Sequence, residues 1–235
     1  INGRHVTEDH ALEAIESARN GRPQEGNVGG GTGMMTYEFK GGTGTSSRQV
    51  TIAGNSWIVG AQVQSNFGVR HQLSILGVPV GQEITDKAHF SEMGESEQGS
   101  IIVVIGTDAP LLPNQLRRLA KRGALGIART GSSGGHYSGD IILAFSVAND
   151  RDINRRNAET PSVLQNMTCL DDHYLDAIYE AAVQSVEEAI INALVAAETV
   201  PLVKPAGKSW HKLDHQKLRE VMAKYNRLND QSVFG

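Results

Sequence analysis

A glycine and a serine meet at the start of an apolar run in the segment ESEQGSIIVVIG, residues 95–106. The Ser100 hydroxyl could attack the carbonyl carbon of Gly99, a residue with no side chain to obstruct the approach. Hydrolysis of the resulting ester would make Ser100 a new chain start. Its α-amine, with an ordinary pKa of about 7.7–8.0, could then act as general base for its own hydroxyl. A Gly-Ser pair is more often an ordinary strand start, so the residues alone leave both interpretations open.

Other candidate sites are weaker. The Walker phosphate loop is absent from the sequence, and GNVGGGTGM (26–34) does not satisfy the dinucleotide pattern G-x-G-x-x-G. His136 lies two residues from Ser138, a spacing that says little about geometry, so we expect an exposed loop histidine. His211 and His215 are four residues apart without the glutamate of H-E-x-x-H, so we expect solvated histidines and no metal site.

Composition restricts the classes of function. The 235 residues include 26 acidic and 22 basic side chains, a net charge of −4, with 5% aromatic residues. Neutralisation of nucleic-acid phosphates therefore has little support, and we expect no nucleic-acid partner. No run of 18 apolar residues is present, so we expect no membrane partner and take the cytoplasm as the default location, with the periplasm as the alternative. Cys169, the single cysteine, excludes an internal disulfide and is expected to be buried.

Hydrophobic periodicity and turn residues predict a chain of the α+β class. Helices are expected at 8–20 with Thr7 as cap, at 113–122 before a stop at Gly123, at 171–200, and after Asp214. Strands are expected near 34–39, 47–53, 57–68, 101–106, 124–129 and 141–147. The continuous apolar run at 101–106 is typical of a strand buried on both faces.

Glycine is unusually frequent, at 26 of the 235 residues, against about 7% in an average protein. The glycines alternate with strand-like segments, so we expect tight turns and close backbone approach rather than disorder. The loops 29–33 and 39–45 could line a site where a substrate backbone approaches, or could be turns beneath the sheet. Lys40 and Arg48 are expected to be solvated or paired for structural reasons.

Four motifs, in this order, resemble the DmpA-type family of self-processing N-terminal-serine peptidases. That family includes the L-aminopeptidase/D-esterase/amidases and the β-peptidyl aminopeptidases. The motifs are GNVGGGTGM…FKGGTGTSSR, VQSNFG, GSIIVVIGTDAPLLPNQLRRLAKRGALGIAR and SGDIILAFSVAN. The resemblance extends from about residue 1 to 200. It implies a four-layer αββα sandwich, layered like the Ntn hydrolases but with the strand connections of the DmpA and ornithine acetyltransferase type.

The resemblance also implies how the chain is divided. Self-cleavage between Gly99 and Ser100 would make residues 1–99 the C-terminal part of an α chain. Residues 100–235 would form a β chain that begins with the nucleophile. The two pieces are expected to stay together as a single structural domain, from which an amino-terminal segment of the family is missing ahead of Ile1.

The site residues implied by the resemblance follow the same motifs. Ser100 would be the nucleophile, Ser138 and Asp140 its supporting serine and acid, and Asn66 a contributor to the oxyanion hole. Some family members have glutamate at the acid position, so Asp140 is one methylene shorter. No cofactor or metal is implied. Substrate-binding positions are expected in the first glycine loop, at Gly30, Gly31, Thr32 and Gly33.

The implied activity is removal of the N-terminal residue from short peptides, amides or esters through an acyl-enzyme on Ser100. The implied assembly is a homo-oligomer of αβ heterodimers. Two alternatives stay open. One is an Ntn-type acyltransferase of the ornithine acetyltransferase kind, although those enzymes use threonine at the new terminus. The other is a non-enzymatic, glycine-rich ligand-binding domain in which the Gly99–Ser100 bond stays intact.

Overall fold

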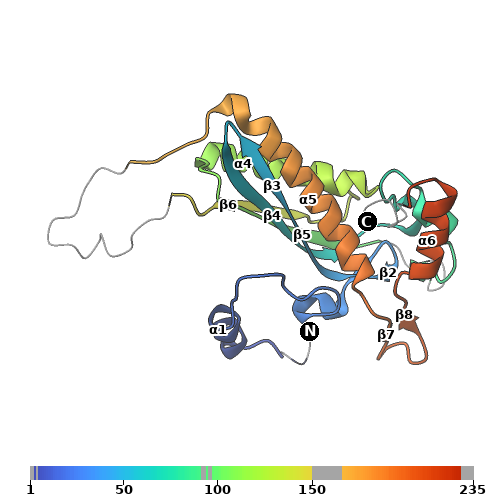
Figure 1. The fold of residues 1–235 in the computed structure, drawn as a ribbon. Coiled ribbons are helices and arrows are strands. Elements are labelled where there is room, and N and C mark those ends of the chain that lie inside the picture. The colour runs from blue at the N-terminus through green and yellow to red at the C-terminus, as the bar shows by residue number, and fades with distance from the viewer. Residues whose placement is uncertain (1–2, 4, 91–93, 95–96, 150–165, 229–235) are drawn as a thin grey trace.

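A four-stranded sheet forms the centre of the molecule, with strand order β3-β4-β5-β6 (Figure 1). The computed structural model describes residues 3, 5–90, 94, 97–149 and 166–228. The strands are β3 (Gly42–Ile52), β4 (Asn55–Asn66), β5 (Ser100–Thr107) and β6 (Ile141–Ser146). The β3–β4 and β4–β5 pairs are antiparallel, whereas β5 and β6 are parallel. The parallel pair requires a crossover, and the helix that follows β5 supplies it.

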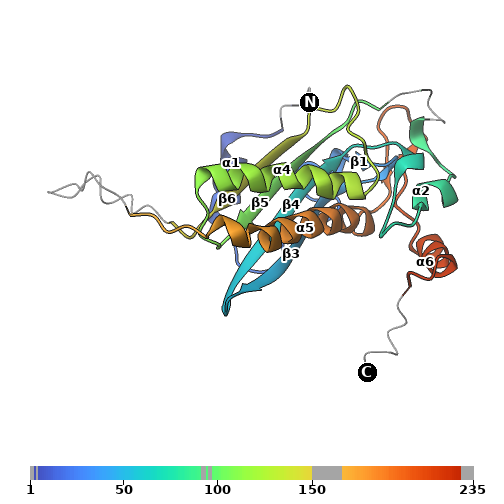
Figure 2. The same ribbon diagram turned by 90° about the horizontal axis from the view of Figure 1, so that it is seen from above.

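Two long helices cover one face of this sheet. These are α4 (Pro113–Arg129) and α5 (Leu175–Val195), which lie side by side over the strands (Figure 2). Alternate side chains of the strands point toward the helices and are buried, as the two-residue period of a strand requires. They include Val59, Val63, Ile101, Val103 and Ile105, all at most 1% exposed.

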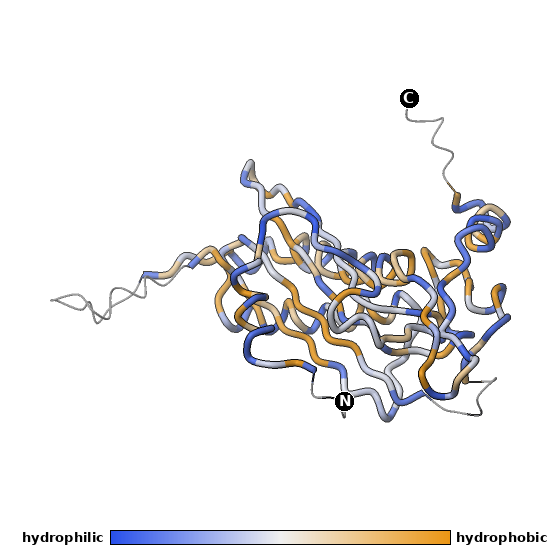
Figure 3. The backbone as a smooth tube through the Cα atoms, turned by 90° about the horizontal axis from the view of Figure 1, so that it is seen from below, coloured by the Kyte–Doolittle hydropathy of each residue, from blue (hydrophilic) through white to orange (hydrophobic). Residues whose placement is uncertain are grey.

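The opposite face of the sheet is apolar and accessible. Ile102, Ile141, Leu143 and Phe145 are all exposed there, Ile102 by 48%. In Figure 3, which views the sheet from the side away from α4 and α5, apolar segments run along the strands. The expectation that 101–106 is buried on both faces is therefore wrong within this chain. The described residues supply a helix layer and a sheet layer, and the exposed face has the apolar character on which a second sheet packs in a sandwich.

Glycines allow α5 to pack closely against β3 and against α4. A Cβ on Gly44 would lie 1.9 Å from the carbonyl oxygen of Ala189 in α5, and one on Gly126 would lie 2.7 Å from that of Val183. Residues 42–45 consequently belong to β3 rather than to a loop. The helix stop expected at Gly123 and the strand expected over 124–129 are also wrong. Both segments belong to α4, because these glycines serve close packing rather than chain reversal.

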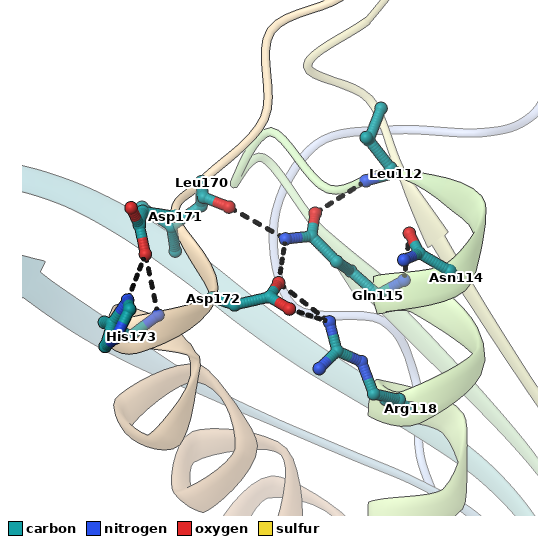
Figure 4. Close-up of polar contacts among 8 residues, drawn as sticks. All are labelled: Leu112, Asn114, Gln115, Arg118, Leu170, Asp171, Asp172 and His173. Atoms are coloured by element: carbon teal, nitrogen blue, oxygen red, sulfur yellow. Dashed lines mark hydrogen bonds and ion pairs between the residues drawn. The ribbon is translucent and has the colours of Figure 1, made fainter.

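A polar network joins the amino-terminal ends of α4 and α5 (Figure 4). The Gln115 amide donates to the Leu170 carbonyl and to Asp172 Oδ1, both at 2.8 Å, while its Oε1 accepts from the Leu112 N–H at 2.9 Å. Arg118 Nη2 donates to both oxygens of Asp172, at 2.7 and 2.8 Å. The network closes the start of α4 and fixes the segment that leads into α5.

Helix caps follow the sequence closely. The helix α1 (Glu8–Glu16) begins after Thr7, although it ends earlier than residue 20. Asp171 accepts from the His173 N–H in the short 3₁₀ turn η4 (Asp172–Tyr174) ahead of α5. Asp214 accepts from the first N–H groups of α6 (His215–Lys224). The Asp171 and Asp214 caps satisfy amide donors that a helix cannot pair internally, whereas at Thr7 the backbone N–H donates to His10 Nδ1 at 3.0 Å.

The remaining elements are short. The strand expected at 34–39 is split into β1 (Met35–Thr36) and β2 (Phe39–Lys40), because Tyr37 and Glu38 adopt positive φ angles between them. The others are η1 (Gly29–Gly33), η2 (Arg70–Gln72), α2 (Val80–Glu83), β7 (Val200–Pro201) and β8 (Ser209–Trp210). Cys169 is exposed, contrary to expectation. Among the described residues, no helix has the length and apolar character to cross a bilayer.

Candidate active site

The end of β4 lies beside the start of β5. In this antiparallel ladder the Cα atoms of Asn66 and Ser100 are direct partners. Directly opposed residues project from the same face of a sheet, with their Cβ atoms about 5 Å apart. The predicted nucleophile and the predicted oxyanion residue are therefore neighbours on the face turned away from α4 and α5.

The loop before β6 supplies the other side of the site. The Ser100 hydroxyl oxygen accepts from the Gly139 N–H at 2.8 Å. Ser138 Oγ donates to Asp140 Oδ1 at 2.6 Å, and the same carboxylate oxygen accepts from the Ile101 N–H at 3.1 Å. The carboxylate thus reaches the backbone immediately after Ser100 despite its shorter side chain. Parallel pairing of β6 with β5 holds this loop against the start of β5.

A backbone contact fixes the orientation of the Asn66 amide. Asn66 Oδ1 accepts from the Met35 N–H at 2.9 Å. The oxygen side of the amide is therefore occupied, and the NH₂ group is the side available to a developing negative charge. Thr36 donates from Oγ1 to the Ser65 carbonyl at 2.8 Å, which ties β1 to the end of β4 at this point.

A cavity of about 720 Å³ opens at the junction before Ser100. Its lining includes Gly33, Met35, Asn66 and Gly99, together with the aromatic rings of Phe90 and Trp210. This volume is within the range of sites for small ligands, about 300–1,000 Å³. The cavity is thus lined both by Asn66 and by Gly99, the residue whose carbonyl forms the Gly99–Ser100 bond.

Gly99 is constrained by its partner strand. A Cβ at this position would lie 2.0 Å from the carbonyl oxygen of Asn66, a distance that backbone atoms cannot accept. Two residues earlier, the Glu97 carboxylate accepts a short hydrogen bond from the Gly68 N–H. The segment that leads to Ser100 is therefore anchored on both sides of the Gly99 position.

The predicted substrate-binding residues lie in η1 and have different surroundings. Gly33 lines the cavity beside Asn66. Gly31 is buried against Gly26 and Thr43, and a Cβ on Gly30 would meet the Gln64 side chain. Thr32 Oγ1 donates to the Gly29 carbonyl at 2.8 Å. The structure therefore brings Gly33 to the cavity and gives the other three contacts within their own loop and with neighbouring strands.

The histidines considered from the sequence lie outside this cluster. His136 is exposed and packs edge-on against Tyr137, with ring centroids 5.0 Å apart. His215 Nε2 is 2.9 Å from the Val195 carbonyl oxygen. Within the described residues, no group of three or more His, Cys, Asp or Glu side chains is placed to hold a metal ion.

Sequence reasoning missed three groups in the site. The N–H groups of Gly139 and Met35 belong to the backbone, so no residue type signals their role. Lys40 is fully buried and donates to three backbone carbonyls, so of the two expectations for it, solvation is wrong and pairing for structural reasons holds. Arg48 does have the expected structural role, pairing with Glu188 of α5 at 2.5 Å.

Comparison with known proteins identifies the family to which this chain belongs. Peptidase family S58 matches residues 1–206. The β-peptidyl aminopeptidase BapA of Sphingosinicella microcystinivorans is 46% identical over an aligned length of 242 residues. The alignment covers 97% of this chain and 59% of the relative. The L-aminopeptidase D-Ala-esterase/amidase of Ochrobactrum anthropi, a variant of the Ntn-hydrolase fold, is also 46% identical, with a TM-score of 0.89 over 97% of this chain and 60% of that one.

A β-aminopeptidase from a Burkholderia species has a TM-score of 0.81 at 39% identity, covering 94% of this chain and 60% of its own. The chain thus spans about three fifths of the length of these relatives. The expected α+β class and Ntn-hydrolase-like layering are confirmed. The match over residues 1–206, the curated relative and the structural neighbours agree, and the chain belongs to peptidase family S58.

Proposed function

We propose that this chain is the catalytic part of a self-cleaving serine aminopeptidase. In this proposal the enzyme removes the N-terminal residue from short peptides, amides or esters through an acyl-enzyme on Ser100. The observation that carries the proposal is the β4–β5 register, which pairs Asn66 with Ser100. The loop 138–140 adds a hydroxyl, an N–H and a carboxylate on the other side of Ser100.

The first step is maturation of the continuous chain. Ser100 Oγ attacks the Gly99 carbonyl carbon, and the C–N bond breaks as the hydroxyl proton passes to the departing nitrogen. The product is an ester between Gly99 and Ser100 Oγ. Water then adds to the ester carbonyl, which leaves a carboxylate on Gly99 and restores the Ser100 hydroxyl. The absence of a side chain on Gly99 favours the attack.

Turnover repeats this chemistry on a substrate. The freed Ser100 amine accepts the proton from its own hydroxyl as Oγ attacks the first carbonyl of the substrate, and it returns the proton to the leaving amine. The Asn66 NH₂ group stabilises the oxyanion, a contribution on the order of 3 kcal/mol. Asp140, which hydrogen-bonds Ser138 and the Ile101 N–H, orients the amine. Water then releases the acyl group.

The two alternatives are weaker. An acyltransferase of the ornithine acetyltransferase kind uses threonine as the nucleophile, and this chain has serine at position 100. A non-enzymatic ligand-binding domain has no use for the Ser138–Asp140 pair beside Ser100. The matched relatives are aminopeptidases, which also favours the peptidase.

The decisive experiment combines mass and activity. We expect the mature wild-type protein to give fragments that end at Gly99 and begin at Ser100, and to hydrolyse aminoacyl anilides from a panel of L-, D- and β-amino acids. Ser100→Ala should give one uncleaved, inactive chain. Ser133→Ala, an exposed serine of the neighbouring loop, is the control and should behave like wild type. A cleaved or active Ser100→Ala protein contradicts the proposal.

Assembly and location complete the proposal. We infer a homo-oligomer of αβ units in the cytoplasm, with the periplasm as the alternative. The large exposed apolar surface on the sheet supports burial of this chain against further protein. Analytical ultracentrifugation of the mature protein and cell fractionation test these two statements.

A further inference from the structure

Lys40 is a buried cation held by backbone carbonyls. Its side chain is 0% exposed, and Nζ donates to the carbonyl oxygens of Gly31, Met34 and Gly41 at 2.8, 2.8 and 2.6 Å. In the described part of the chain, Lys40 forms no ion pair. Burial lowers the pKa of this ammonium to about 8, so at neutral pH it still has three protons to donate.

Such an arrangement is costly as a device for stability. Desolvation of an ammonium without a carboxylate partner carries a large penalty, and an apolar side chain of similar volume is often at least as stable in such a place. The three carbonyls do, however, belong to residues before β1 and after β2, at the two ends of the segment 31–41. The ammonium therefore fixes the shape of the backbone that lies against Asn66.

One peptide group connects Lys40 to the site. The Met34 carbonyl accepts from Lys40 Nζ at 2.8 Å and from the Gly41 N–H at 3.0 Å. The N–H of the same peptide group, on Met35, donates to Asn66 Oδ1 at 2.9 Å. A cation at the carbonyl end of a peptide group makes its N–H a stronger donor, because successive hydrogen bonds polarise one another. The same polarisation continues through the Asn66 amide to its NH₂ group.

We propose that Lys40 is a positioning residue for Asn66, acting through the Met34–Met35 peptide group to orient and polarise the amide that stabilises the oxyanion. The proposal rests on the proposed function, in which Asn66 faces the developing charge. Lys40 itself touches neither the Gly99 carbonyl nor Ser100 in the contacts described for it. Its effect is therefore expected on the rate of the chemical step rather than on substrate binding.

A double-mutant cycle tests this relay in the full-length protein. The variants are Lys40→Met, Asn66→Ala and the combination, with Lys121→Met on the exposed face of α4 as the control. For each we would measure the rate of Gly99–Ser100 cleavage, kcat and KM for an aminoacyl anilide, and thermal unfolding. We expect Lys40→Met to lower kcat and the cleavage rate by roughly tenfold with KM unchanged, and Asn66→Ala to lower them by about 100-fold. The control should match wild type.

The decisive comparison is the effect of Lys40→Met in the Asn66→Ala background. If Lys40 acts through Asn66, that effect should nearly vanish. A full tenfold loss in that background, or a Lys40→Met protein with the wild-type kcat, overturns the proposal. Wild-type kcat in Asn66→Ala instead overturns the oxyanion role in the proposed function. If Lys40→Met does not fold, the same cycle is run with Lys40→Gln, which keeps two N–H donors and removes the charge.

Discussion

Asn66 and Ser100 face each other across the β4–β5 ladder, at the last residue of one strand and the first residue of the next. This pairing places an amide donor beside the hydroxyl that the proposed mechanism uses. It also places the Asn66 carbonyl where a side chain at position 99 would have to go. One backbone register thus determines both the nucleophile's partner and the identity of the residue before it.

Gly99→Ala is expected to impair self-cleavage. The added Cβ would lie 2.0 Å from the Asn66 carbonyl oxygen, so the junction must shift and carry the Gly99 carbonyl away from Ser100 Oγ. A misplacement of about 1 Å can cost about 100-fold in rate. Gel electrophoresis over time would measure the cleavage rate. The matched control is Gln98→Ala, one residue earlier, which adds no Cβ and should cleave normally; equal rates in the two variants would contradict this reasoning.

Substitutions at Asp140 should separate the effect of the carboxylate charge from the effect of side-chain length. Asp140→Asn removes the charge that accepts from Ser138 and from the Ile101 N–H, so we expect kcat to fall about 100-fold. Asp140→Glu keeps the charge and adds one methylene, so it should lose less activity than Asp140→Asn. Ser138→Ala leaves the carboxylate in place and should also be milder. Steady-state kinetics on one anilide would rank the three, and a more active Asp140→Asn than Asp140→Glu would refute the role given to the charge.

The network of Figure 4 predicts a pH dependence of stability. Hydrogen bonds from Arg118 and then from Gln115 hold the pKa of Asp172 below its ordinary value of 3.8. A carboxyl group whose pKa is lower in the folded protein stabilises the fold above the unfolded pKa and loses this effect as pH falls through the folded pKa. Urea unfolding should therefore show wild type more stable than Asp172→Asn at pH 6, with a smaller difference below about pH 4.

The control for this measurement is Asp176→Asn. Asp176 lies in the first turn of α5, is exposed, and has no ion pair among the contacts described for the chain. Its substitution should change stability little at either pH. A difference between wild type and Asp172→Asn that stays constant from pH 6 to pH 3 would show that the carboxylate charge is not what the network uses.

Close packing of α5 against β3 and against α4 predicts a graded stability loss. Alanine at Gly44 would bring a Cβ within 1.9 Å of the Ala189 carbonyl, so the helix must move away, at a cost of about 1–3 kcal/mol. Alanine at Gly126 has a less severe contact of 2.7 Å and gains about 1 kcal/mol of helix propensity. Urea unfolding should therefore rank Gly44→Ala as less stable than Gly126→Ala. The reverse order would contradict the packing argument.

Local signals in the sequence determined much of the secondary structure. Thr7, Asp171 and Asp214 mark the starts of helical segments, and the structure confirms each start. The Asp171 and Asp214 side chains satisfy free amide donors there. The strands β4, β5 and β6 follow from β-branched apolar runs bounded by turn residues. These features depend on a few neighbouring residues, so they can be read without the fold.

The structural role of a glycine could not be predicted from the sequence, for a physical reason. Gly123 has the residue type of a helix stop, yet α4 continues through it, because a side chain there would meet Ile142 of β6. The same glycine permits chain reversal or close packing, and only the neighbouring element decides which occurs. The short apolar segment 124–129 has the same ambiguity between strand and helix, since periodicity needs more residues to distinguish them.

In the candidate site, too, the residue types follow from the sequence, whereas their arrangement follows only from the fold. The sequence by itself contained Ser100, Ser138, Asp140 and Asn66 as residue types in motifs, together with the chemistry that a serine after glycine allows. Only the tertiary structure decided that the Met35 and Gly139 N–H groups hold the Asn66 and Ser100 side chains, and that Lys40 is buried behind them. Backbone donors carry no side-chain signature, and the burial of a lysine depends on which turn folds over it. Strand register and loop closure are long-range properties, so the geometry that joins these residues exists only in the folded chain.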